Sequence, residues 1–436
     1  MTVVLRASAL CCVILLTLAA CSPPNPSSLK VEQFQSVEKT ELASATAQPG
    51  EWPWWRGPTR DGRAAESEDP PVRWTATENI LWQVPIAGRG HSTPSVSKDR
   101  LFLATADEKL EEQKLLCLQK DTGTELWSVV VHKSGFVHTH TKNTHASGTP
   151  ACDGERVYIS FLNADAIHTS AYTYGGDLVW QKKSSDFETR HGYGSSPVLW
   201  GPLVIVAADS SGDSALVAHH RVTGEPVWKS SRRTEPSFGT PIVATIGGRD
   251  QLLHGGTLLV SSYNPQNGAP LWFAEGTSMT SGNTLAFTDE YVIASGGYPQ
   301  KEIVCVKADG RGDVTDTHVA WRNKRGVTYV PSPIVDKGRV IIVNDDGIIG
   351  CWEVKTGKEL WRKRLRGNFT SSPIYAGGRY YLPNEAGVTT VFRIDPSFEV
   401  IQLNDLSDGG FASPVICGNR IYLRTRSKLF CIGAKS

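Results

Sequence analysis

The chain has 436 residues, of which 40% are hydrophobic and 20% charged, a composition typical of globular domains that excludes disorder for most of its length. Its 41 glycines, 25 prolines and 13 tryptophans, against 2 methionines, favour many short strands joined by turns over a helical bundle. The formal net charge is +1 and falls to zero without the first twenty residues, which include one arginine, so we expect no nucleic-acid partner.

The N-terminus has the pattern of an export signal. Arg6 precedes the apolar run from Ala7 to Ala20, which has the length of a signal-peptide core and is too short to span a membrane stably. Leu18-Ala19-Ala20-Cys21 resembles a bacterial lipobox, so we expect residues 1–20 to be a lipoprotein signal peptide and Cys21 to carry the lipid. An ordinary cleavage site with an incidental cysteine is the alternative. Lipidation predicts a protein of the bacterial cell envelope, anchored to the membrane and facing the periplasm.

Two segments precede the repetitive part of the chain. Residues 21–50 are poor in aromatic residues and rich in Ser, Pro, Ala and Gln, which predicts a flexible tether. Residues 51–78 form an N-terminal extension to which the sequence alone assigns no role.

The rest of the chain, residues 79–436, is built from repeats with two landmarks. The first is a small residue followed by proline and a short strand, at Pro94, Pro150, Pro197, Pro241, Pro333, Pro373 and Pro414, with Thr284 taking the place of the proline in a degenerate copy. The second is a tryptophan that closes each unit, at Trp82, Trp127, Trp180, Trp228, Trp272, Trp321 and Trp361. An eighth copy at Ile401 has lost its tryptophan, so the chain contains eight units.

Each unit holds about four runs of alternating apolar and polar residues separated by turn pairs, which predicts four antiparallel strands. Four-stranded units repeated radially are the signature of a β-propeller. We therefore expect an all-β, eight-bladed β-propeller. Because the first tryptophan precedes the first proline step, the strand Ile80–Ile86 is expected to complete the last blade, between Phe411 and Ile432.

The repeated tryptophans are expected to pack between neighbouring blades as structural residues, and truncating one, such as Trp361→Ala, is expected to cost about 3–5 kcal/mol. The glycine of the preceding turn, at Gly123, Gly224, Gly268 and Gly357, permits a positive φ where a Cβ would clash. Six cysteines remain after Cys21 and no CxxC motif is present, so we expect free thiols.

The stretches Asp121–Trp127 and Val354–Trp361 resemble the tryptophan-docking motif D-x-x-T-G-x-x-x-W of the pyrroloquinoline-quinone (PQQ) repeat superfamily. Trp52–Gly62 (WPWWRGPTRDG) is similar to a stretch of exported PQQ-like propeller proteins. The resemblance implies a propeller and two alternatives for function. One is a non-catalytic, BamB-like envelope lipoprotein that binds or assembles proteins without a cofactor, and the other is a quinoprotein oxidoreductase.

The enzyme alternative would need PQQ with calcium, a carboxylate base and usually an adjacent cysteine pair. Here the only such pair is Cys11-Cys12, inside the leader, and no residue matches the calcium ligands or the base. We therefore assign no catalytic residues and no cofactor, and expect a monomer with an envelope protein as partner. A propeller that binds a small ligand or a metal is kept as a further alternative.

Seven loops that enter the innermost strands carry a ring-bearing residue: His91, His145, Tyr193, Phe238, Tyr329, Phe369 and Phe411. These rings are expected at one mouth of the central channel, where they either plug the channel or form a binding surface for a ligand or peptide. In the same region His138, His140 and His145 are candidate metal ligands, the alternative being an exposed polar loop.

Overall fold

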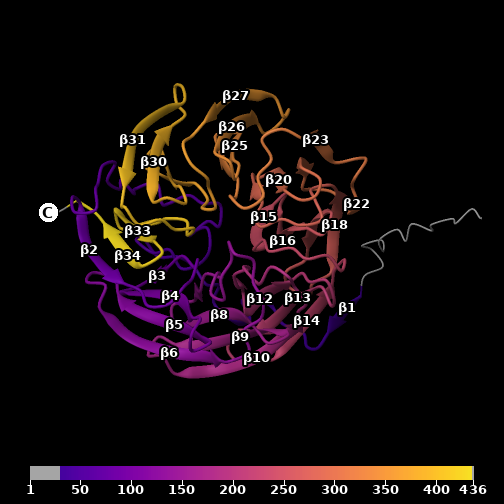
Figure 1. Ribbon diagram of the computed structural model, residues 1–436. Helices are drawn as coiled ribbons and strands as arrows, with labels where there is room; N and C mark the ends of the chain where they lie inside the picture. Colours follow the sequence, from indigo (N-terminus) through magenta and orange to yellow (C-terminus); the bar gives the residue numbers. More distant parts are fainter. Residues whose placement is uncertain (1–29, 435–436) are drawn as a thin grey trace, which may run out of the picture.

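The computed structural model describes residues 30–434, and the predicted signal peptide and Cys21 lie outside this range. Eight antiparallel sheets stand around a common centre like the blades of a propeller (Figure 1). The predicted all-β, eight-bladed propeller is therefore confirmed. Within the described residues, no helix has the length and apolar character needed to cross a bilayer.

The first four blades follow one another along the chain. Blade 1 consists of β3 (Ser95–Ser97), β4 (Arg100–Asp107), β5 (Glu112–Gln119) and β6 (Glu125–Lys133), and blade 2 of β7 (Ala151–Cys152), β8 (Arg156–Asn163), β9 (Ala166–Thr173) and β10 (Leu178–Asp186). Blade 3 consists of β11 (Val198–Trp200), β12 (Leu203–Ala208), β13 (Ala215–His220) and β14 (Pro226–Ser231), and blade 4 of β15 (Ile242–Ile246), β16 (Arg249–Gly256), β17 (Leu259–Tyr263) and β18 (Pro270–Glu275).

The second four blades complete the ring. Blade 5 consists of β19 (Ala286–Phe287), β20 (Tyr291–Gly296), β21 (Glu302–Lys307) and β23 (Val319–Asn323), and blade 6 of β24 (Ile334–Asp336), β25 (Arg339–Val343), β26 (Ile348–Glu353) and β27 (Glu359–Arg364). Blade 7 consists of β28 (Ile374–Ala376), β29 (Arg379–Pro383), β30 (Val388–Arg393) and β31 (Glu399–Asp405), and blade 8 of β32 (Val415–Cys417), β33 (Arg420–Arg424), β34 (Lys428–Ile432) and β2 (Ile80–Pro85).

The ring closes as the sequence predicts. Strand β2 pairs antiparallel with β34, with Trp82 opposite Cys431 and Val84 opposite Leu429. The outer strand of the last blade thus comes from the beginning of the repetitive region. The two ends of the propeller lie side by side at blade 8 (Figure 1).

The hydrophobic core lies in the seams between adjacent blades, and an indole occupies each of seven seams. Trp228 of blade 3 is fully buried, and its Nε1 donates a hydrogen bond to the Pro265 carbonyl of blade 4 at 3.1 Å. A Cβ added to Gly268, which has φ of +68°, would lie 2.5 Å from this ring. The same contact of an indole with a turn glycine of the next blade joins Trp82 to Gly123, Trp127 to Gly176, Trp180 to Gly224 and Trp321 to Gly357.

Two seams use the indole differently. The Nε1 of Trp272 donates to Gln251 Oε1 of its own blade at 2.7 Å, while its ring joins a core cluster that includes Val304 and Val306 of blade 5. Trp361 packs 5.0 Å from the ring of Phe398 in blade 7 and is partly exposed. Each indole still bridges two blades.

The eighth seam, between blades 7 and 8, contains an indole that the repeat pattern does not reveal. Ile401 stands where the repeat has its tryptophan, and Trp74 of the N-terminal extension is buried in this seam instead. The backbone N–H of Trp74 donates to Asn404 Oδ1 at 2.9 Å, and its ring stacks 6.4 Å from Tyr381. The N-terminal extension is thus part of the propeller core.

The small residue before each proline is always serine or threonine, and its hydroxyl joins neighbouring blades. The backbone N–H of Thr149 donates to Ser196 Oγ and that of Ser196 to Thr240 Oγ1, both at 2.9 Å. The same N–H to hydroxyl contact links Thr93 to Thr149, Thr284 to Ser332, Ser332 to Ser372 and Ser372 to Ser413. We call these eight residues the hydroxyl ring: Thr93, Thr149, Ser196, Thr240, Thr284, Ser332, Ser372 and Ser413.

The hydroxyl ring corrects the alignment of the degenerate fifth repeat. From the sequence, Thr284 is placed at the position of the proline in this repeat. Its hydrogen bond to Ser332 shows that it is the hydroxyl residue, and Leu285 stands at the proline position before β19. The copy keeps the residue that joins the blades and loses only the proline.

The chain before β2 runs down one wall of the propeller and then across one of its faces. Strand β1 (Val31–Gln33) pairs with β14, and a short 3-10 helix, η2 (Lys39–Glu41), follows. Lys39 Nζ then lies 2.5 Å from Asp250 Oδ2, and Arg221 Nη2 donates to the Ala43 carbonyl at 2.6 Å. The described part of the predicted tether therefore differs from a free chain, because side chains on the blades hold it.

The N-terminal extension covers the face that carries the turns between the first and second strand of the blades, which we call the turn face. It contacts successive blades: Cys152 N–H donates to the Pro53 carbonyl, Arg63 Nη1 lies 2.8 Å from Asp336 Oδ1, and the Glu68 carboxylate accepts hydrogen bonds from Gly418 and Asn419. The opposite face, with the loops that lead into the innermost strands, is the mouth face.

Blade 4 has a fifth strand, β22 (Gly312–Asp313), which pairs in parallel with β18.

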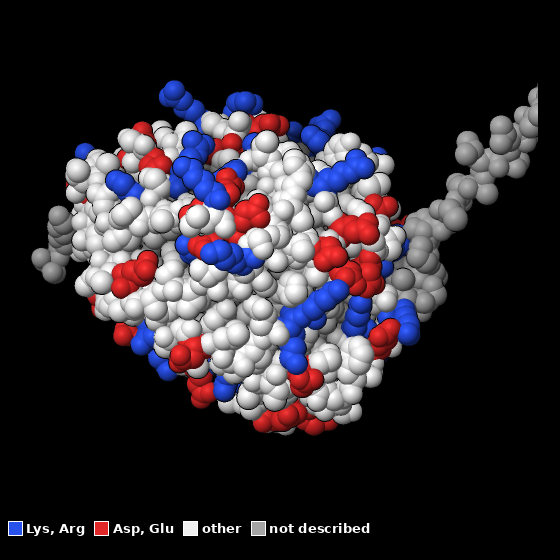
Figure 2. Space-filling model, turned by 60° about the horizontal axis from the view of Figure 1, so that its bottom comes forward, with Lys and Arg blue, Asp and Glu red and all other residues white. Residues whose placement is uncertain are grey.

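The charged side chains follow no single patch on the surface seen in Figure 2, where basic and acidic residues are interspersed. Many of them are paired, as in the contacts of Arg339 with Asp395 at 2.8 Å and of Lys182 with Glu225 at 2.7 Å.

The six cysteines of the described residues are buried and unpaired, which confirms the expected free thiols: Cys117, Cys152, Cys305, Cys351, Cys417 and Cys431.

We predict that Trp228→Ala lowers the free energy of unfolding by about 3–5 kcal/mol, because it removes a fully buried indole and leaves a cavity between blades. Trp361→Ala should lower the free energy of unfolding by less than the about 3–5 kcal/mol expected from the sequence, because the Trp361 ring is partly exposed. Urea unfolding followed by circular dichroism measures both. Leu126→Ala, at a side chain 45% exposed on the outer wall, is the control and should change stability by less than about 0.5 kcal/mol. Equal effects of Trp228→Ala and Leu126→Ala would contradict the seam as the source of stability.

Deleting Ile80–Pro85 should abolish the cooperative thermal transition, because blade 8 would lose its outer strand and the ring would open at the seam with blade 1. Deleting Val31–Gln33 is the matched control, since β1 also lies on an outer edge but is a fifth strand of its blade. The control should keep a cooperative transition within a few degrees of the intact chain. Similar melting of both deletions would show that closure contributes no special stability.

Candidate functional site

The central channel contains a cavity of about 760 Å³ that we call the mouth cavity. At its inner end lie Trp55 and members of the hydroxyl ring, including Thr149, Ser196 and Thr240. Toward the mouth face it is lined by rings from several blades: His91, His140, His191, Phe238, Tyr298, Tyr329 and Phe411. Rings on loops held by a rigid scaffold are the usual make-up of a binding site for an apolar or aromatic group.

Four of the seven ring-bearing residues predicted at the mouth line this cavity. They are His91, Phe238, Tyr329 and Phe411. His91 and Phe411, from the first and the last of the loops, meet edge to face with centroids 4.6 Å apart. The structure therefore brings together residues that are 320 positions apart in the sequence.

Tyr193 and Phe369 do not reach the cavity. Tyr193 is buried, its Oη donates to the Ala207 carbonyl at 3.0 Å, and its ring meets Phe187 edge to face. Phe369 is fully buried in the core cluster of blades 6 and 7. Both rings fix the mouth loops from behind, which is a structural role rather than the predicted binding role.

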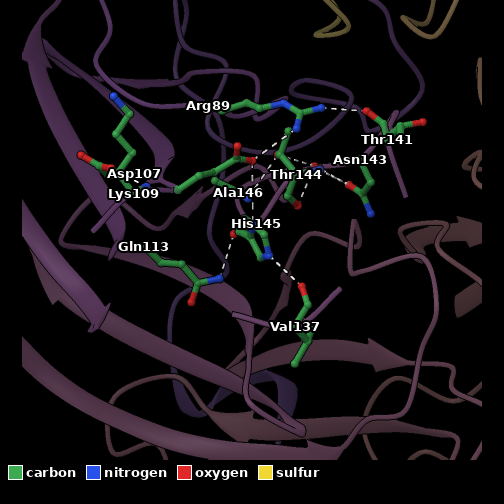
Figure 3. Close-up of polar contacts among 12 residues, drawn as sticks. Arg89, Asp107, Lys109, Gln113, Val137, Thr141, Asn143, Thr144, His145 and Ala146 are labelled. Carbon is green, nitrogen blue, oxygen red and sulfur yellow. Dashed lines mark hydrogen bonds and ion pairs between the residues drawn. The ribbon is translucent and has the colours of Figure 1, made fainter. Parts of the chain in front are cut away.

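His145 is likewise turned into its own loop, as Figure 3 shows. Its Nε2 lies 2.9 Å from the Val137 carbonyl, and its ring stacks on Phe136 with centroids 3.9 Å apart. Gln113 Nε2 donates to the His145 carbonyl at 2.8 Å, and nearby Arg89 donates to the Thr141 carbonyl at 2.7 Å. This network holds the long connection between blades 1 and 2 against the propeller.

The histidines proposed as metal ligands separate in the structure. His140 lines the cavity, His145 packs in the loop, and His138 is exposed and does not line the cavity. His140 Nδ1 accepts a hydrogen bond from the Lys142 N–H at 3.2 Å, its ring lies 5.7 Å from that of His191, and the His191 ring in turn lies 5.6 Å from that of Phe238. Among the described residues, no group of three or more His, Cys, Asp or Glu side chains could hold a metal ion.

The floor of the cavity comes from the N-terminal extension, which sequence reasoning did not connect with the mouth. Trp55 Nε1 donates to Thr284 Oγ1 at 2.8 Å, so the indole is fixed to the hydroxyl ring. The next residue, Arg56, is buried, and its Nη2 donates to the Pro333 and Asp61 carbonyls, both at 2.7 Å. Burial lowers the pKa of Arg56 to about 10. The extension thereby closes the channel toward the turn face.

The electrostatics of the cavity wall favour neutral groups. Burial, helped by the positive charges of Arg424, Arg89 and Arg426, lowers the pKa of His91 to about 3, so this imidazole is uncharged at neutral pH. Burial also raises the pKa of Asp345, whose carboxylate accepts hydrogen bonds from the backbone N–H groups of Tyr329 at 2.8 Å and Val330 at 3.2 Å. Asp345 therefore positions the loop that carries the Tyr329 ring.

Apart from Asp345, the charged residues that line the cavity are exposed: Lys142, Lys301 and Asp346. Lys142 Nζ pairs with Glu385 Oε1 at 2.8 Å. A wall of rings with charges at its edge suits the insertion of an apolar or aromatic group from solvent or from a partner.

A serine–histidine contact occurs elsewhere in the propeller. Ser184 Oγ lies 3.0 Å from His219 Nε2, and His219 Nδ1 lies 3.1 Å from the Gly224 carbonyl. Both side chains are buried between blades 2 and 3, and Ser184 also bonds to Thr169 at 2.7 Å. Burial lowers the pKa of His219 to about 4. The pair has the distances of a hydrolytic dyad, but a substrate cannot reach it.

We predict that His91 weakens the fold at acidic pH. Its folded-state pKa of about 3 lies below the unfolded value of about 6.5, so the unfolded chain binds more protons between these values. Stability is then fully present above pH 6.5 and is lost as pH falls toward 3. When the pH falls from 7 to 4.5, the free energy of unfolding should drop in both proteins. The drop should be up to about 2–3 kcal/mol larger in the unaltered protein than in the His91→Phe variant. Urea unfolding at both pH values measures this, and an identical pH dependence in the variant would contradict it.

Comparisons with known proteins agree with the propeller. The family model described as "outer membrane protein assembly factor BamB" matches residues 111–310 and 311–397. Among solved structures, BamB from Moraxella catarrhalis is similar with a TM-score of 0.59 and 16% identity, covering 82% of this chain and 97% of that chain. A comparison with curated protein sequences found no match.

Two further solved structures are similar at low identity. The computationally designed Ika8 protein has a TM-score of 0.57 and 13% identity, covering 81% of this chain and 99% of its own. A europium-containing methanol dehydrogenase has a TM-score of 0.49 and 12% identity, covering 79% and 90%. At 16% and 13% identity, the Moraxella BamB and Ika8 structures show the fold alone. The family model, which covers more than half of the chain, shows more: the protein belongs to the BamB-type family of PQQ-like repeat β-propellers.

Proposed function

We propose that this protein is a non-catalytic scaffold of the bacterial cell envelope, anchored by a lipid on Cys21 at the periplasmic side, which binds a partner protein at the mouth cavity. Membership of the BamB-type family supports a role in protein assembly. The mouth cavity carries the proposal, because it is a rigid, ring-lined pocket that the N-terminal extension closes at its inner end.

The size and chemistry of the cavity suit an anchoring side chain of a partner. Phe238, Tyr329 and Phe411 offer ring surfaces from three different blades, and His91 adds an uncharged imidazole. An aromatic side chain buries roughly 150–250 Å², which is worth about 4–6 kcal/mol as an upper estimate. A single inserted ring is therefore enough to act as the hot spot of an interface whose rim contacts supply selectivity.

The residues at the mouth do not fit a calcium ion beside a quinone. The closest set of oxygen donors is the run Asn344, Asp345 and Asp346, and two of these side chains already accept backbone hydrogen bonds. Asn344 Oδ1 accepts from Asp346 and Ile348, and the Asp345 carboxylate accepts from Tyr329 and Val330. This favours the scaffold over the PQQ-dependent oxidoreductase.

Site-specific photo-crosslinking in membranes tests the scaffold. A photo-reactive residue at Thr370 or Met279, which line the cavity, should capture one defined protein that mass spectrometry identifies. The same residue at Leu126 or Leu178, exposed on outer strands, should not capture it. Once the partner is identified, its affinity for the purified variants can be measured. Phe238→Ala and Phe411→Ala should each weaken this binding at least about tenfold, whereas Leu126→Ala should not.

Two outcomes would overturn the proposal. Unchanged affinity in both mouth variants would move the binding site away from the cavity. Reduction of a dye by the purified protein with PQQ, calcium and an alcohol or sugar, lost on heat inactivation, would replace the scaffold by the oxidoreductase.

A further inference from the structure

Strand β1 fixes the place at which the N-terminal segment reaches the propeller. It pairs antiparallel with β14, with Val31 opposite Ser230 and Gln33 opposite Trp228, and the Ser231 N–H donates to the Lys30 carbonyl at 2.9 Å. In Figure 1, β1 lies at the outer edge beside β14. Since Ser231 is the last residue of β14, Lys30 lies at that same end of blade 3.

That end of blade 3 belongs to the mouth face. Strand β14 begins after the turn that carries Gly224, against which Trp180 packs, and it ends in the loop that contains Pro236 and Phe238. Both of these residues line the mouth cavity. The N-terminal segment therefore arrives on the mouth side and, because the strands are antiparallel, runs from there toward the turn face.

Several contacts hold the segment along this path. Phe34 N–H donates to the Val227 carbonyl at 2.8 Å, Gln33 Nε2 donates to the Asn267 carbonyl of blade 4, and Gln35 Nε2 donates to the Pro226 carbonyl at 3.1 Å. Farther on, Lys39 pairs with Asp250, and Glu41 Oε1 lies 3.1 Å from His220 Nε2. The first of these attachments along the chain is β1.

We propose that β1 turns the mouth face toward the bilayer, so that the mouth cavity takes a partner held at the membrane surface. The nine residue steps from Cys21 to Lys30 span at most about 30 Å when fully extended. A lipid on Cys21 thus keeps the mouth-side end of blade 3 within about 30 Å of the lipid headgroups. This inference deepens the proposed function and rests on its anchor at Cys21.

The orientation depends on β1 itself. Without it, the attachment nearest to the anchor among those above is Phe34, whose N–H donates to the Val227 carbonyl near the start of β14, at the turn-face end of that strand. Thirteen residue steps separate Cys21 from Phe34, which allows about 45 Å of extended chain. Releasing a strand of three residues would therefore lengthen the reach from about 30 Å to about 45 Å and move the pivot to the turn-face end of blade 3.

Energy transfer to a labelled membrane tests the orientation. A hexahistidine tag placed directly before Ser22 and bound to vesicles with a nickel-chelating lipid reproduces the anchor without lipidation. A donor dye is attached at Arg366→Cys, after β27 at the mouth face, or at Lys355→Cys, before β27 at the turn face; both side chains are exposed. The six native cysteines of the described residues are buried, so they should react little with the dye.

With an acceptor dye on the lipid headgroups, the label at position 366 should transfer energy at least about twice as efficiently as the label at position 355. Glu32→Pro, in the middle of β1, should reduce or abolish this difference, because proline cannot donate to the strand ladder. Ser36→Pro is the matched control, since it lies outside β1 and the Ser36 N–H makes no hydrogen bond in the described structure.

Equal transfer from both labels, or more transfer from position 355, would overturn the orientation, and so would an unchanged difference in Glu32→Pro. Attachment of the native chain is measured separately, by flotation of membranes that carry the lipid-modified protein and a Cys21→Ser variant. If native Cys21 does not direct membrane attachment, the anchor in the proposed function fails, while the orientation measured with the tagged chain still reports the effect of β1.

Discussion

The structure depends on the seam between adjacent blades. A four-stranded sheet has two apolar faces here, and each is buried only when another blade stands beside it. In five of the eight seams, the indole of one blade rests on the turn glycine of the next, where a β-carbon would overlap the ring. On the channel side, the hydroxyl ring joins neighbouring blades through hydrogen bonds from backbone N–H groups to side-chain hydroxyls. The channel between these joints is consequently rigid, which is what a preformed binding cavity requires.

Most of the fold could be predicted because the residues that form the seams between blades recur along the sequence. The tryptophan, the turn glycine and the small-proline step recur at similar spacing, and their phase gives the closure of blade 8. The hydroxyl of the small residue was missed, although serine or threonine stands at all eight positions. Trp74 could not be found in this way, because it fills the eighth seam from outside the repeat.

The candidate site could be predicted only in part. Sequence position placed seven rings near the mouth, but the direction of each side chain depends on how its loop folds back. Tyr193 turns inward to reach the Ala207 carbonyl, and His145 turns to stack on Phe136, whereas Phe238 and Phe411 remain in the cavity. Trp55 joins the site through a hydrogen bond to Thr284, a residue 229 positions away. Contacts at such separation leave no periodic signal in a single sequence.

The origin of the outer strand of blade 8 also affects how the protein can fold. Strand β2 is synthesised before blades 1 to 7, whereas its partner β34 follows them, so the β2–β34 pairing cannot form until these seven blades have been synthesised. Until then both strand edges lack their partner, and exposed edges of this kind favour aggregation. The long sequence separation also predicts slow formation of the final contacts. A chaperone that shields unpaired strands would therefore be most useful to this protein between synthesis of β2 and synthesis of β34.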